Sequence, residues 1–351
     1  MKKPITVLIV DDSALIREMF SEMLSSAPDI QVLGTAADPF EAREKIKQLN
    51  PDVLTLDIEM PKMDGLSFLE KIMTLRPMPV VMVSSLTQKG AEATIRALEL
   101  GAFDYVSKPV TNQNRDTIGV LKQELISKVQ AAALAHIRAQ IKSSATGHAV
   151  KILPFSPPPH PNRRLIAIGS STGGVEALRE IFLQLPANAP PIVITQHMPA
   201  TFTTSFAARL NMLSQVNVAE ARHHERLKPG HAYLAPGGES HLAITKIAGD
   251  YVCRIEPGET VTGHRPSVDV LFHSVAEAAG AHAIGVILTG MGRDGAAGLK
   301  AMRERGAYTI GQDKASCVVY GMPQAAMHAG ASTVELPLSK IAHIALHLCE
   351  Q

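Results

Sequence analysis

The chain has 351 residues, too many for one ordinary hydrophobic core, and we expect two domains because a domain usually holds about 100 to 200 residues. Its formal net charge of +1 excludes a strong overall field that would draw it to nucleic acid or to a membrane surface. Three widely spaced cysteines are typical of a reducing compartment and argue against a disulfide framework or a zinc site. No stretch approaches the roughly 18 uncharged apolar residues of a membrane span, and the apolar run near the N-terminus is too short for a secretion signal. We therefore expect a soluble, cytoplasmic protein without membrane insertion.

The first part of the chain alternates short β-branched runs with segments of helical periodicity. This alternation predicts a parallel sheet with helices on both faces. The expected strands are near-continuous apolar runs, as doubly buried strands require: Ile5–Val10, Gln31–Thr35, Val53–Leu56, Val80–Val83 and Asp104–Val106. The expected helices have apolar residues at three- and four-residue spacing: Ala14–Ser25, Pro39–Leu49, Gly65–Leu75, Gly90–Leu100 and Thr117–Ile141.

A proline-rich segment separates this part from a second alternating series. Four prolines lie within residues 157–161 and indicate a semi-extended linker. We expect a first domain over residues 1–130, a helical tail and linker over 131–162, and a second α/β domain over 163–351. The strands expected in the second domain are Leu165–Gly169, Ile192–Gln196, Ile284–Thr289 and Tyr308–Gly311. The helices expected there are Val175–Leu185, Ser267–Ala279 and Gly295–Glu304.

The middle of the second domain has a different pattern. Residues 217–256 form short alternating runs around Pro229-Gly230, Gly237-Gly238 and Gly249-Asp250, which are turn signals typical of hairpins. We expect an antiparallel hairpin insert there. The fold class predicted for the whole chain is α/β, with two doubly wound parallel-sheet domains.

Polar groups stand at four strand ends of the first domain, where ligands bind in open α/β sheets. They are Asp11 and Asp12 after the first strand, Asp57 after the third, Ser84 after the fourth and Lys108 after the fifth. Three carboxylates together suit Mg²⁺, which uses few carboxylates and keeps several of its waters. One carboxylate could attack a phosphoryl group, while Lys108 and Ser84 hold the phosphoryl oxygens. Taken alone, Asp11 or Asp12 is more simply a helix N-cap, and Asp57 or Lys108 part of a turn or loop.

The first domain resembles the response-regulator receiver family over nearly all of its first 125 residues, through DD, LDIEMPKMDG, VSS and YVSKP at these strand ends. The resemblance implies a flavodoxin-like fold in which Asp57 accepts phosphate. It also implies Mg²⁺ as cofactor for phosphorylation, held by Asp12, Asp57 and the carbonyl of Glu59. In that family the residue at the position of Asp11 helps to hold the waters of the metal.

The same resemblance implies a phosphodonor and a switch. The phosphodonor would be a chemotaxis histidine kinase. The switch residues would be Ser84, whose hydroxyl contacts the phosphoryl group, Lys108, which pairs with it, and Tyr105, which changes position on activation. Many receivers have threonine where this chain has Ser84, but the hydroxyl that matters is present.

The second domain offers a nucleophile, a base and an acid at its strand ends. Its first strand runs into GSSTG, which fits the G-x-S-x-G turn that exposes a serine hydroxyl near helix amides able to stabilise an oxyanion. Ser171 is therefore the candidate nucleophile. His197 ends the next strand and could act as its base, and Asp294 follows a later buried run and could orient the histidine. The order Ser, His, Asp differs from that of α/β-hydrolases, so we expect a different doubly wound fold.

Each of these residues has a simpler explanation when taken alone. The Ser-Gly turn or Asp294 can cap a helix, and His197 is one of 14 histidines. A metallohydrolase is disfavoured because the other histidines considered are not at zinc-binding spacing: His223, His224, His241, His264 and His273. A nucleotide site is disfavoured because the glycines do not follow G-x-G-x-x-G and the lysine of a phosphate-binding loop is absent.

The blocks IGSSTGG, ITQHMP and LTGMGRDGAAGL of the second domain resemble the three signature blocks of the CheB family of chemotaxis methylesterases. The order of receiver, linker and catalytic domain is also that of the family. This resemblance implies that Ser171, His197 and Asp294 form a catalytic triad. The amides near Thr172 and Met291 are then the candidates for the oxyanion hole.

The family resemblance also implies the substrate and the regulation. The expected activity is phosphorylation-activated hydrolysis of glutamyl methyl esters on methyl-accepting chemotaxis receptors, with deamidation of glutamine side chains and no cofactor for the esterase reaction. Because the linker keeps the receiver at high effective concentration beside the catalytic domain, we expect the unphosphorylated receiver to cover the Ser171 cleft. Arg293, between two signature residues, has no assigned role.

Two other functions fit parts of the sequence. One is a response regulator whose output is binding to protein or nucleic acid, although no basic stripe or helix-turn-helix favours nucleic acid. The other is a receiver-controlled serine hydrolase that acts on a small ester or amide, which triad chemistry alone does not exclude.

Overall fold

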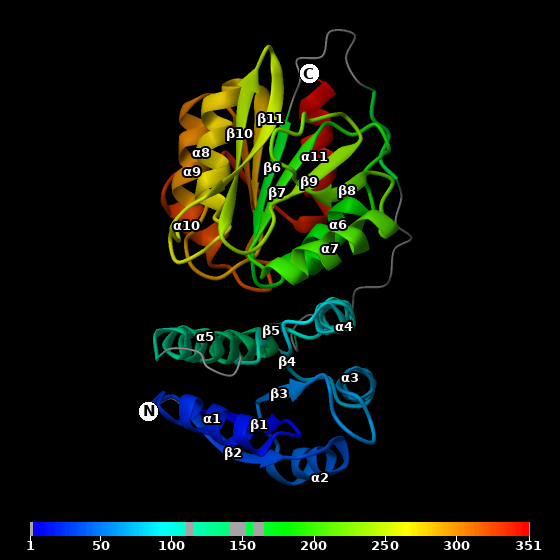
Figure 1. The fold of residues 1–351 in the computed structure, drawn as a ribbon, viewed down its shortest axis with the longest axis vertical. Coiled ribbons are helices and arrows are strands. Elements are labelled where there is room, and N and C mark those ends of the chain that lie inside the picture. The colour runs from blue at the N-terminus through cyan, green and yellow to red at the C-terminus, as the bar shows by residue number, and fades with distance from the viewer. Residues whose placement is uncertain (1–2, 110–114, 140–151, 157–164, 351) are drawn as a thin grey trace. The chain divides into compact units, whose positions relative to one another are not determined.

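The computed structural model describes residues 3–109, 115–139, 152–156 and 165–350 (Figure 1). The chain divides into two compact units, Met1–Gly147 and His148–Gln351. Most of the expected proline-rich linker falls on residues 140–151 and 157–162, which lie outside the described residues. Within the described part of the chain, no helix combines the length and the apolar character needed to cross a membrane.

The first unit is a five-stranded parallel sheet of order β2-β1-β3-β4-β5. Its strands are β1 (Ile5–Val10), β2 (Ile30–Ala36), β3 (Val53–Asp57), β4 (Val80–Ser84) and β5 (Asp104–Ser107). Its helices are α1 (Ala14–Ser25), α2 (Pro39–Leu49), α3 (Gly65–Leu75), α4 (Gln88–Glu99) and α5 (Arg115–Ala139). Helices α1 and α5 lie on one face of the sheet and α2, α3 and α4 on the other (Figure 1). The strand order is that of flavodoxin-like folds, which confirms the fold predicted for this domain.

Capping side chains determine where the loops at the strand ends finish. Ser13, Asp38, Asp64 and Thr87 each accept a hydrogen bond from an amide in the first turn of the following helix. Such caps satisfy amides that have no partner inside the helix. Strands β3 and β4 are buried along their whole length, which explains their continuous apolar sequences.

The second unit is a seven-stranded parallel sheet of order β14-β13-β12-β6-β7-β9-β8, with a separate antiparallel hairpin. The parallel strands are β6 (Leu165–Ser170), β7 (Ile192–Gln196), β8 (Asn217–Glu220), β9 (His231–Leu234), β12 (Ala283–Ile287), β13 (Tyr308–Gln312) and β14 (Val334–Leu336). The hairpin consists of β10 (Ser240–Ile247) and β11 (Asp250–Pro257). The helices are α6 (Gly174–Phe182), α7 (Ala200–Leu213), α8 (Val268–Ala279), α9 (Ala296–Glu304), α10 (Met322–His328) and α11 (Leu338–Glu350).

Helices cover both faces of the larger sheet. Figure 1 shows α8, α9 and α10 on one side and α6, α7 and α11 on the other. Aromatic side chains from these helices, among them Phe182, Phe202 and Phe272, are completely buried in the core. The predicted class, a doubly wound parallel-sheet domain with a hairpin insert, is therefore confirmed.

The antiparallel insert is shorter than the sequence predicts. Only β10 and β11 pair antiparallel, whereas β8 and β9 join the main sheet as parallel strands. The connection from β8 to β9 runs back along β11, where His224 N–H donates to the Cys253 carbonyl at 2.8 Å and Leu227 N–H to the Tyr251 carbonyl at 2.9 Å. It returns the chain to its starting end, so β9 runs in the same direction as β8. Alternating polarity does not distinguish these two arrangements.

Candidate active site

The three residues predicted to act together stand on neighbouring strands of the larger sheet. Strand β6 lies between β12 and β7, and all three run in parallel, so their carboxyl ends meet at one edge. Ser171 follows β6, His197 follows β7, and Asp294 lies in the loop between β12 and α9. The backbone N–H of His197 donates to the carbonyl of Ser170 at 3.2 Å, which brings the first two segments into contact.

The turn that carries Ser171 is fixed by backbone bonds. The Ser171 N–H donates to the Thr289 carbonyl at 3.1 Å, and the Gly174 N–H donates to the Ser171 carbonyl at 2.7 Å. Gly173 has φ of +77°, a left-handed conformation that favours glycine. At Gly174 a Cβ atom would lie 2.1 Å from Oε1 of Gln196, so a side chain cannot fit there. The two glycines thus let the turn close against its neighbours.

Gln196 is a buried residue of this site that the sequence does not single out. Its Oε1 accepts a hydrogen bond from the Ser170 hydroxyl at 2.6 Å. Its Nε2 donates to the Ser171 carbonyl at 3.0 Å and lies 3.3 Å from the His197 carbonyl. One amide therefore contacts the backbone of both the candidate nucleophile and the candidate base. Its position directly before His197 in the sequence is the only signal that could have indicated it.

His197 and Asp294 form a buried pair. Nε2 of His197 lies 2.8 Å from Oδ2 of Asp294. The other ring nitrogen, Nδ1, is buried and has no hydrogen-bond partner among the described residues. An ionised carboxylate can only accept, so Nε2 carries the proton in the neutral ring. Nδ1 then has the lone pair that can receive a proton from a nucleophile.

Asp294 is held by four donors besides His197. They are the Thr262 hydroxyl at 2.6 Å, the Ser267 hydroxyl at 2.8 Å, the Val268 N–H at 2.7 Å and the Asp269 N–H at 3.2 Å. The two amides belong to the first turn of α8, where the helix dipole favours a negative charge. Burial alone would raise the pKa of Asp294, but the His197 hydrogen bond and charge, with these donors, lower that pKa below its usual value. The acid therefore stays ionised beside His197.

The two candidate oxyanion residues lie beside Ser171. Thr172 is the next residue in the turn, and its carbonyl accepts a hydrogen bond from the Thr289 hydroxyl at 3.0 Å. Met291 follows Gly290, at which a Cβ atom would lie 2.8 Å from Cβ of Ser171. The loop after β12 therefore approaches the nucleophile closely enough to offer an amide.

Arg293 and a pair of histidines on α11 are not part of the candidate triad. Arg293 is exposed and forms no ion pair with a described carboxylate. The histidine pair, His343 and His347, stands at H-x-x-x-H spacing on α11, with ring centroids 6.5 Å apart. Among the described residues, side chains that could hold a metal ion together gather only in the first unit.

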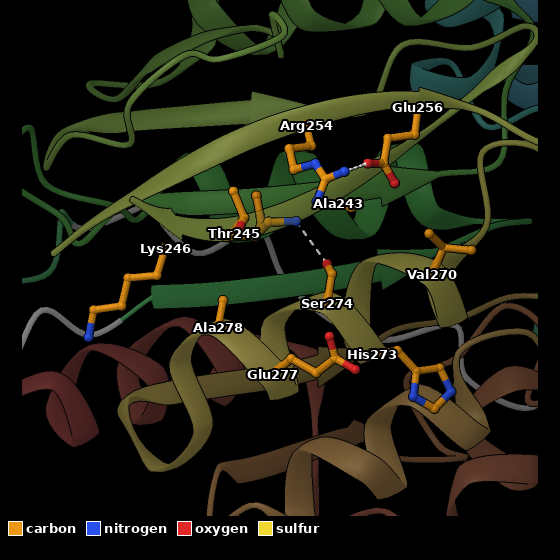
Figure 2. A pocket seen from close by; sticks show the side chains of 11 residues that line it. Ala243, Thr245, Lys246, Arg254, Glu256, Val270, His273, Ser274, Glu277 and Ala278 are labelled. Carbon is orange, nitrogen blue, oxygen red and sulfur yellow. Dashed lines mark hydrogen bonds and ion pairs between the residues drawn. The ribbon is translucent and has the colours of Figure 1, made fainter. Parts of the chain in front are cut away.

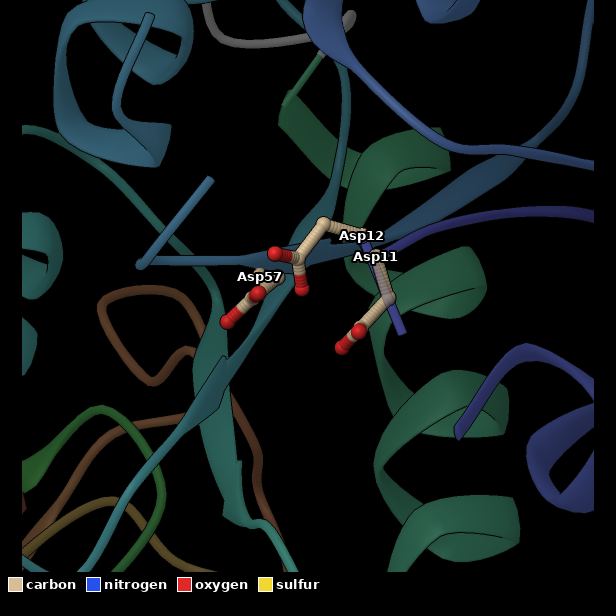
Figure 3. Close-up of side chains that lie close together, drawn as sticks. All are labelled: Asp11, Asp12 and Asp57. Atoms are coloured by element: carbon tan, nitrogen blue, oxygen red, sulfur yellow. The ribbon is translucent and has the colours of Figure 1, made fainter. Parts of the chain in front are cut away.

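That candidate lies at the strand ends of the smaller sheet, where the carboxylates of Asp11, Asp12 and Asp57 come together (Figure 3). One ligand oxygen from each residue lies within 4.8 Å of the others. Lys108 Nζ lies 3.1 Å from Asp11 Oδ2 and 2.8 Å from Asp57 Oδ2. The backbone N–H of Glu59 donates to Asp57 Oδ1 at 3.2 Å. The structure thus brings the predicted acidic residues and Lys108 together.

The electrostatics of this cluster fit a cation. Asp11 and Asp57 are each 1 % exposed, and Asp12 is exposed at the mouth of the site. Burial raises the pKa of Asp57 to about 6, and Lys108 only partly offsets this effect. Burial likewise raises the pKa of Asp11. Oδ2 of Asp11 and of Asp57 are buried, and among the described residues the Lys108 ammonium is the only donor beside them, so a divalent cation with its own waters suits them chemically.

Two of the three predicted switch residues, Ser84 and Tyr105, are buried inside the first unit. The Ser84 hydroxyl is fully buried and accepts a hydrogen bond from the Thr94 hydroxyl of α4 at 2.7 Å. Tyr105 is buried with Lys128 Nζ 4.8 Å from its ring centroid, and burial raises the pKa of its phenol far above the usual value. Both residues therefore make contacts that would have to break if they move.

A separate hollow of about 490 Å³ lies between the hairpin and α8 (Figure 2). Its lining mixes both signs of charge, and Arg254 pairs with Glu256 on the β11 side of the hollow. The Ser274 hydroxyl, which lies between the elements, accepts a hydrogen bond from Ile244 N–H at 2.8 Å. None of the residues predicted to be catalytic, metal-binding or part of the switch lies in the wall of this hollow.

Comparisons with known proteins agree with both units. Residues 166–344 match the family model described as CheB methylesterase, and residues 7–117 match the response regulator receiver domain. The chain is 55 % identical over 336 residues to a protein of Bordetella avium named protein-glutamate methylesterase/protein-glutamine glutaminase 2, covering 96 % of this chain and 95 % of that one. It is 56 % identical over 346 residues to a Caulobacter vibrioides protein of the same kind, covering 98 % of each. The crystal structure of the Thermotoga maritima CheB methylesterase catalytic domain is 40 % identical, with a TM-score of 0.51, covering 53 % of this chain and 98 % of that one.

Proposed function

The chain belongs to the CheB methylesterase family, and from this premise we propose that Ser171, His197 and Asp294 form the catalytic triad of its esterase reaction. The protein is a protein-glutamate methylesterase and protein-glutamine glutaminase with a receiver domain, a hydrolase of bacterial chemotaxis. The observation that carries the proposal is the 2.8 Å contact between His197 Nε2 and Asp294, at the sheet edge where the Ser171 turn lies.

The first half of the reaction is acylation of the serine. Ser171 Oγ attacks the carbonyl carbon of a glutamyl methyl ester, and its proton passes to Nδ1 of His197, the ring nitrogen that has no other partner among the described residues. The amides of Thr172 and Met291 stabilise the oxyanion that forms on the carbonyl oxygen. Asp294, kept ionised by its donors, stabilises the imidazolium. His197 then protonates the departing methoxide, which leaves as methanol.

The second half is hydrolysis of the glutamyl-serine ester. A water molecule gives a proton to Nδ1 of His197 as its oxygen attacks the same carbonyl carbon. The tetrahedral intermediate collapses with Ser171 as the leaving group, which regains its proton from His197. Glutamate is the product. The same steps applied to a glutamine side chain release ammonia, which gives the glutaminase activity.

The test uses a receptor carrying labelled methyl esters. Wild type should release methanol, and Ser171→Ala should reduce the release to the uncatalysed rate while the fold is retained. Continued release from this variant would refute the nucleophile. Turnover of a small ester by wild type, with no release from the receptor, would instead favour a small-molecule hydrolase.

We propose that phosphorylation at Asp57 controls this reaction. Mg²⁺, held by Asp12, Asp57 and the Glu59 carbonyl, would neutralise charge on the incoming phosphoryl group when bound. Asp57 supplies the oxygen that attacks phosphorus, and Asp11 and Lys108 lie beside it to hold solvent and charge. The phosphodonor is a chemotaxis histidine kinase, and the substrates are methyl-accepting chemotaxis receptors.

The control itself can be measured by comparing three forms of the protein. We propose that the unphosphorylated receiver restrains the esterase and that phosphorylation releases it. Three esterase rates are compared: those of the intact chain, of its phosphorylated form and of residues 150–351 alone. The intact unphosphorylated chain should have the lowest rate. Equal rates for all three would contradict the proposal.

A further inference from the structure

A tight turn beside the triad has an unusual backbone. Val261 N–H donates to the His264 carbonyl, and His264 N–H donates to the Val261 carbonyl, both at 3.0 Å. Between them, Thr262 has φ of +50° and Gly263 φ of +82°. Two successive positive φ values are typical of a type I′ turn, which favours glycine and asparagine. A β-branched residue such as Thr262 rarely adopts this conformation, because its side chain crowds the backbone.

Two residues of this turn, the inner Thr262 and the last residue His264, contact different members of the triad. The Thr262 hydroxyl lies 2.6 Å from Oδ1 of Asp294, the length of a charge-assisted hydrogen bond. The His264 ring stacks on the His197 ring, with centroids 3.7 Å apart and planes inclined by 9°. One exposed turn therefore contacts both the acid and the base.

We propose that the turn Val261–His264 is a positioning element of the esterase, in which Thr262 orients Asp294 and His264 fixes the ring plane of His197. This inference rests on the proposed roles of the triad. It explains why threonine occupies a place that suits glycine: glycine has no side chain to donate a hydrogen bond to Asp294. The strained conformation is tolerated because it directs the hydroxyl at the carboxylate.

The geometry leads to an unusual expectation for Thr262. Glycine or asparagine at this position should relieve the backbone, so Thr262→Gly and Thr262→Asn should melt at or above the temperature of wild type. Thr262→Gly loses its side-chain donor to Asp294, so its kcat should fall roughly ten-fold with KM little changed. Thr262→Asn carries an amide N–H that can still donate, so its kcat should fall less. Thr262→Ser keeps the hydroxyl without the branched carbon and should retain kcat within about two-fold. Thr262 is exposed, so these changes should not prevent folding.

The chain provides a matched control in the turn between β10 and β11. Ala248 there has φ of +51° and is followed by Gly249 with φ of +89°, nearly the values of Thr262 and Gly263. Ala248→Gly relieves the same backbone strain without touching the triad. It should raise stability as Thr262→Gly does and leave kcat unchanged. If both variants lowered kcat equally, the effect would come from general loosening and the proposal would be wrong.

The role of the stacked His264 ring is tested with side chains of different shape at this position. His264→Phe keeps a flat face against His197 and should retain most of kcat, whereas His264→Leu fills similar space without a flat face and should lower it several-fold. If phenylalanine and leucine behaved alike, the stacking role would be excluded.

A proton resonance separates this inference from the triad proposal. In the full-length protein, the Nε2 proton of His197 in its bond to Asp294 should give a far-downfield NMR signal. The signal should shift in Thr262→Val, return to its wild-type position in Thr262→Ser and stay unchanged in Ala248→Gly. An unchanged signal in Thr262→Val, or a Thr262→Ser variant as impaired as Thr262→Val, would overturn the positioning role. Failure of Ser171→Ala to abolish hydrolysis would overturn the triad and leave this readout intact.

Discussion

The backbone N–H of Asp269 donates a hydrogen bond to Oδ1 of Asp294 at 3.2 Å, so two buried carboxylates stand side by side at the start of α8. Their pKa values move in opposite directions. His197 and the hydrogen-bond donors lower the pKa of Asp294 despite its burial. Burial raises the pKa of Asp269, although the Gly298 N–H at 2.7 Å from its Oδ1 opposes the rise. The surroundings therefore favour the charged form of Asp294 and disfavour the charged form of Asp269.

Replacing the charged member should disable the enzyme. In Asp294→Asn the carboxylate that orients His197 and stabilises its imidazolium is lost, so kcat should fall about a thousand-fold or more. The donors around Asp294 also lose a charged acceptor, which should lower the free energy of unfolding by about 1–3 kcal/mol at pH 7. Because the folded-state pKa is lowered, this stability is present above the unfolded value and disappears as pH falls. The difference between variant and wild type should therefore shrink in acid denaturation series, and a pH-independent difference would contradict the assignment.

Replacing Asp269 should change stability in the opposite direction from replacing Asp294. Asp269→Asn keeps an oxygen to accept from Gly298 N–H and removes a buried group whose raised pKa opposes ionisation. Wild-type stability from Asp269 falls as pH rises from the unfolded value through the raised folded one. The variant should therefore gain stability relative to wild type as pH rises, and kcat should stay within about three-fold because the backbone donor to Asp294 remains. Melting temperatures from pH 4 to 8 and rates at pH 7 would check both expectations, and a thousand-fold loss would give Asp269 a direct catalytic role instead.

Most of the strands and helices follow from local sequence pattern, and the exceptions have physical causes. The sequence pattern does not predict helix α7, because this segment is rich in threonine and phenylalanine, which are poor helix formers; packing of residues such as Phe202 and Phe206 in the core stabilises it. The predicted antiparallel insert gives strand β9 the wrong direction, because a short, mostly apolar run such as His231–Leu234 has the same sequence pattern in a parallel and in an antiparallel strand. The direction depends on the path of the loop along β11, which is a tertiary contact.

The candidate site divides in the same way. Residues with distinctive chemistry at strand ends, such as Asp57 and His197, can be found from strand topology. The residues that hold them cannot. Gln196 and Thr262 carry no motif of their own, and their roles come from hydrogen bonds to groups that are distant in sequence or belong to the backbone. Such contacts exist only once the chain has folded.

Gln196 should control the geometry of the nucleophile turn. Gln196→Met keeps the length of the side chain but leaves the carbonyls of Ser171 and His197 without their amide donor. We expect kcat to fall about 10- to 100-fold with a loss of about 1–3 kcal/mol in stability. Gln184→Met is a control away from the nucleophile turn, since Gln184 Nε2 donates to the Glu180 carbonyl at 2.9 Å beside α6. If the control lost as much kcat at equal stability, Gln196 would have no specific positioning role.

The raised pKa of Asp57 makes the acidic site sensitive to pH. With a folded pKa of about 6, Asp57 is mostly protonated at pH 5, and a protonated carboxyl neither ligates Mg²⁺ nor attacks phosphorus. Mg²⁺ affinity measured by calorimetry on the full chain should therefore be nearly constant above pH 7 and fall about ten-fold per pH unit below 6. Acidification should not unfold this unit through Asp57, because a raised folded-state pKa means that stability rises as pH falls from about 6 towards the unfolded value.

Lys108 gives this prediction a direct control. Its ammonium, 2.8 Å from Asp57 Oδ2, lowers the pKa of that carboxyl against the larger effect of burial. Lys108→Met removes this charge, so the pKa of Asp57 should move above about 6 and the midpoint of the Mg²⁺ affinity curve should move to higher pH with it. At pH well above the new midpoint the variant should bind Mg²⁺ more tightly than wild type, because the metal no longer competes with a cation for the same oxygens. An unmoved midpoint would mean that another group, with Asp11 as the first candidate, determines the pH dependence.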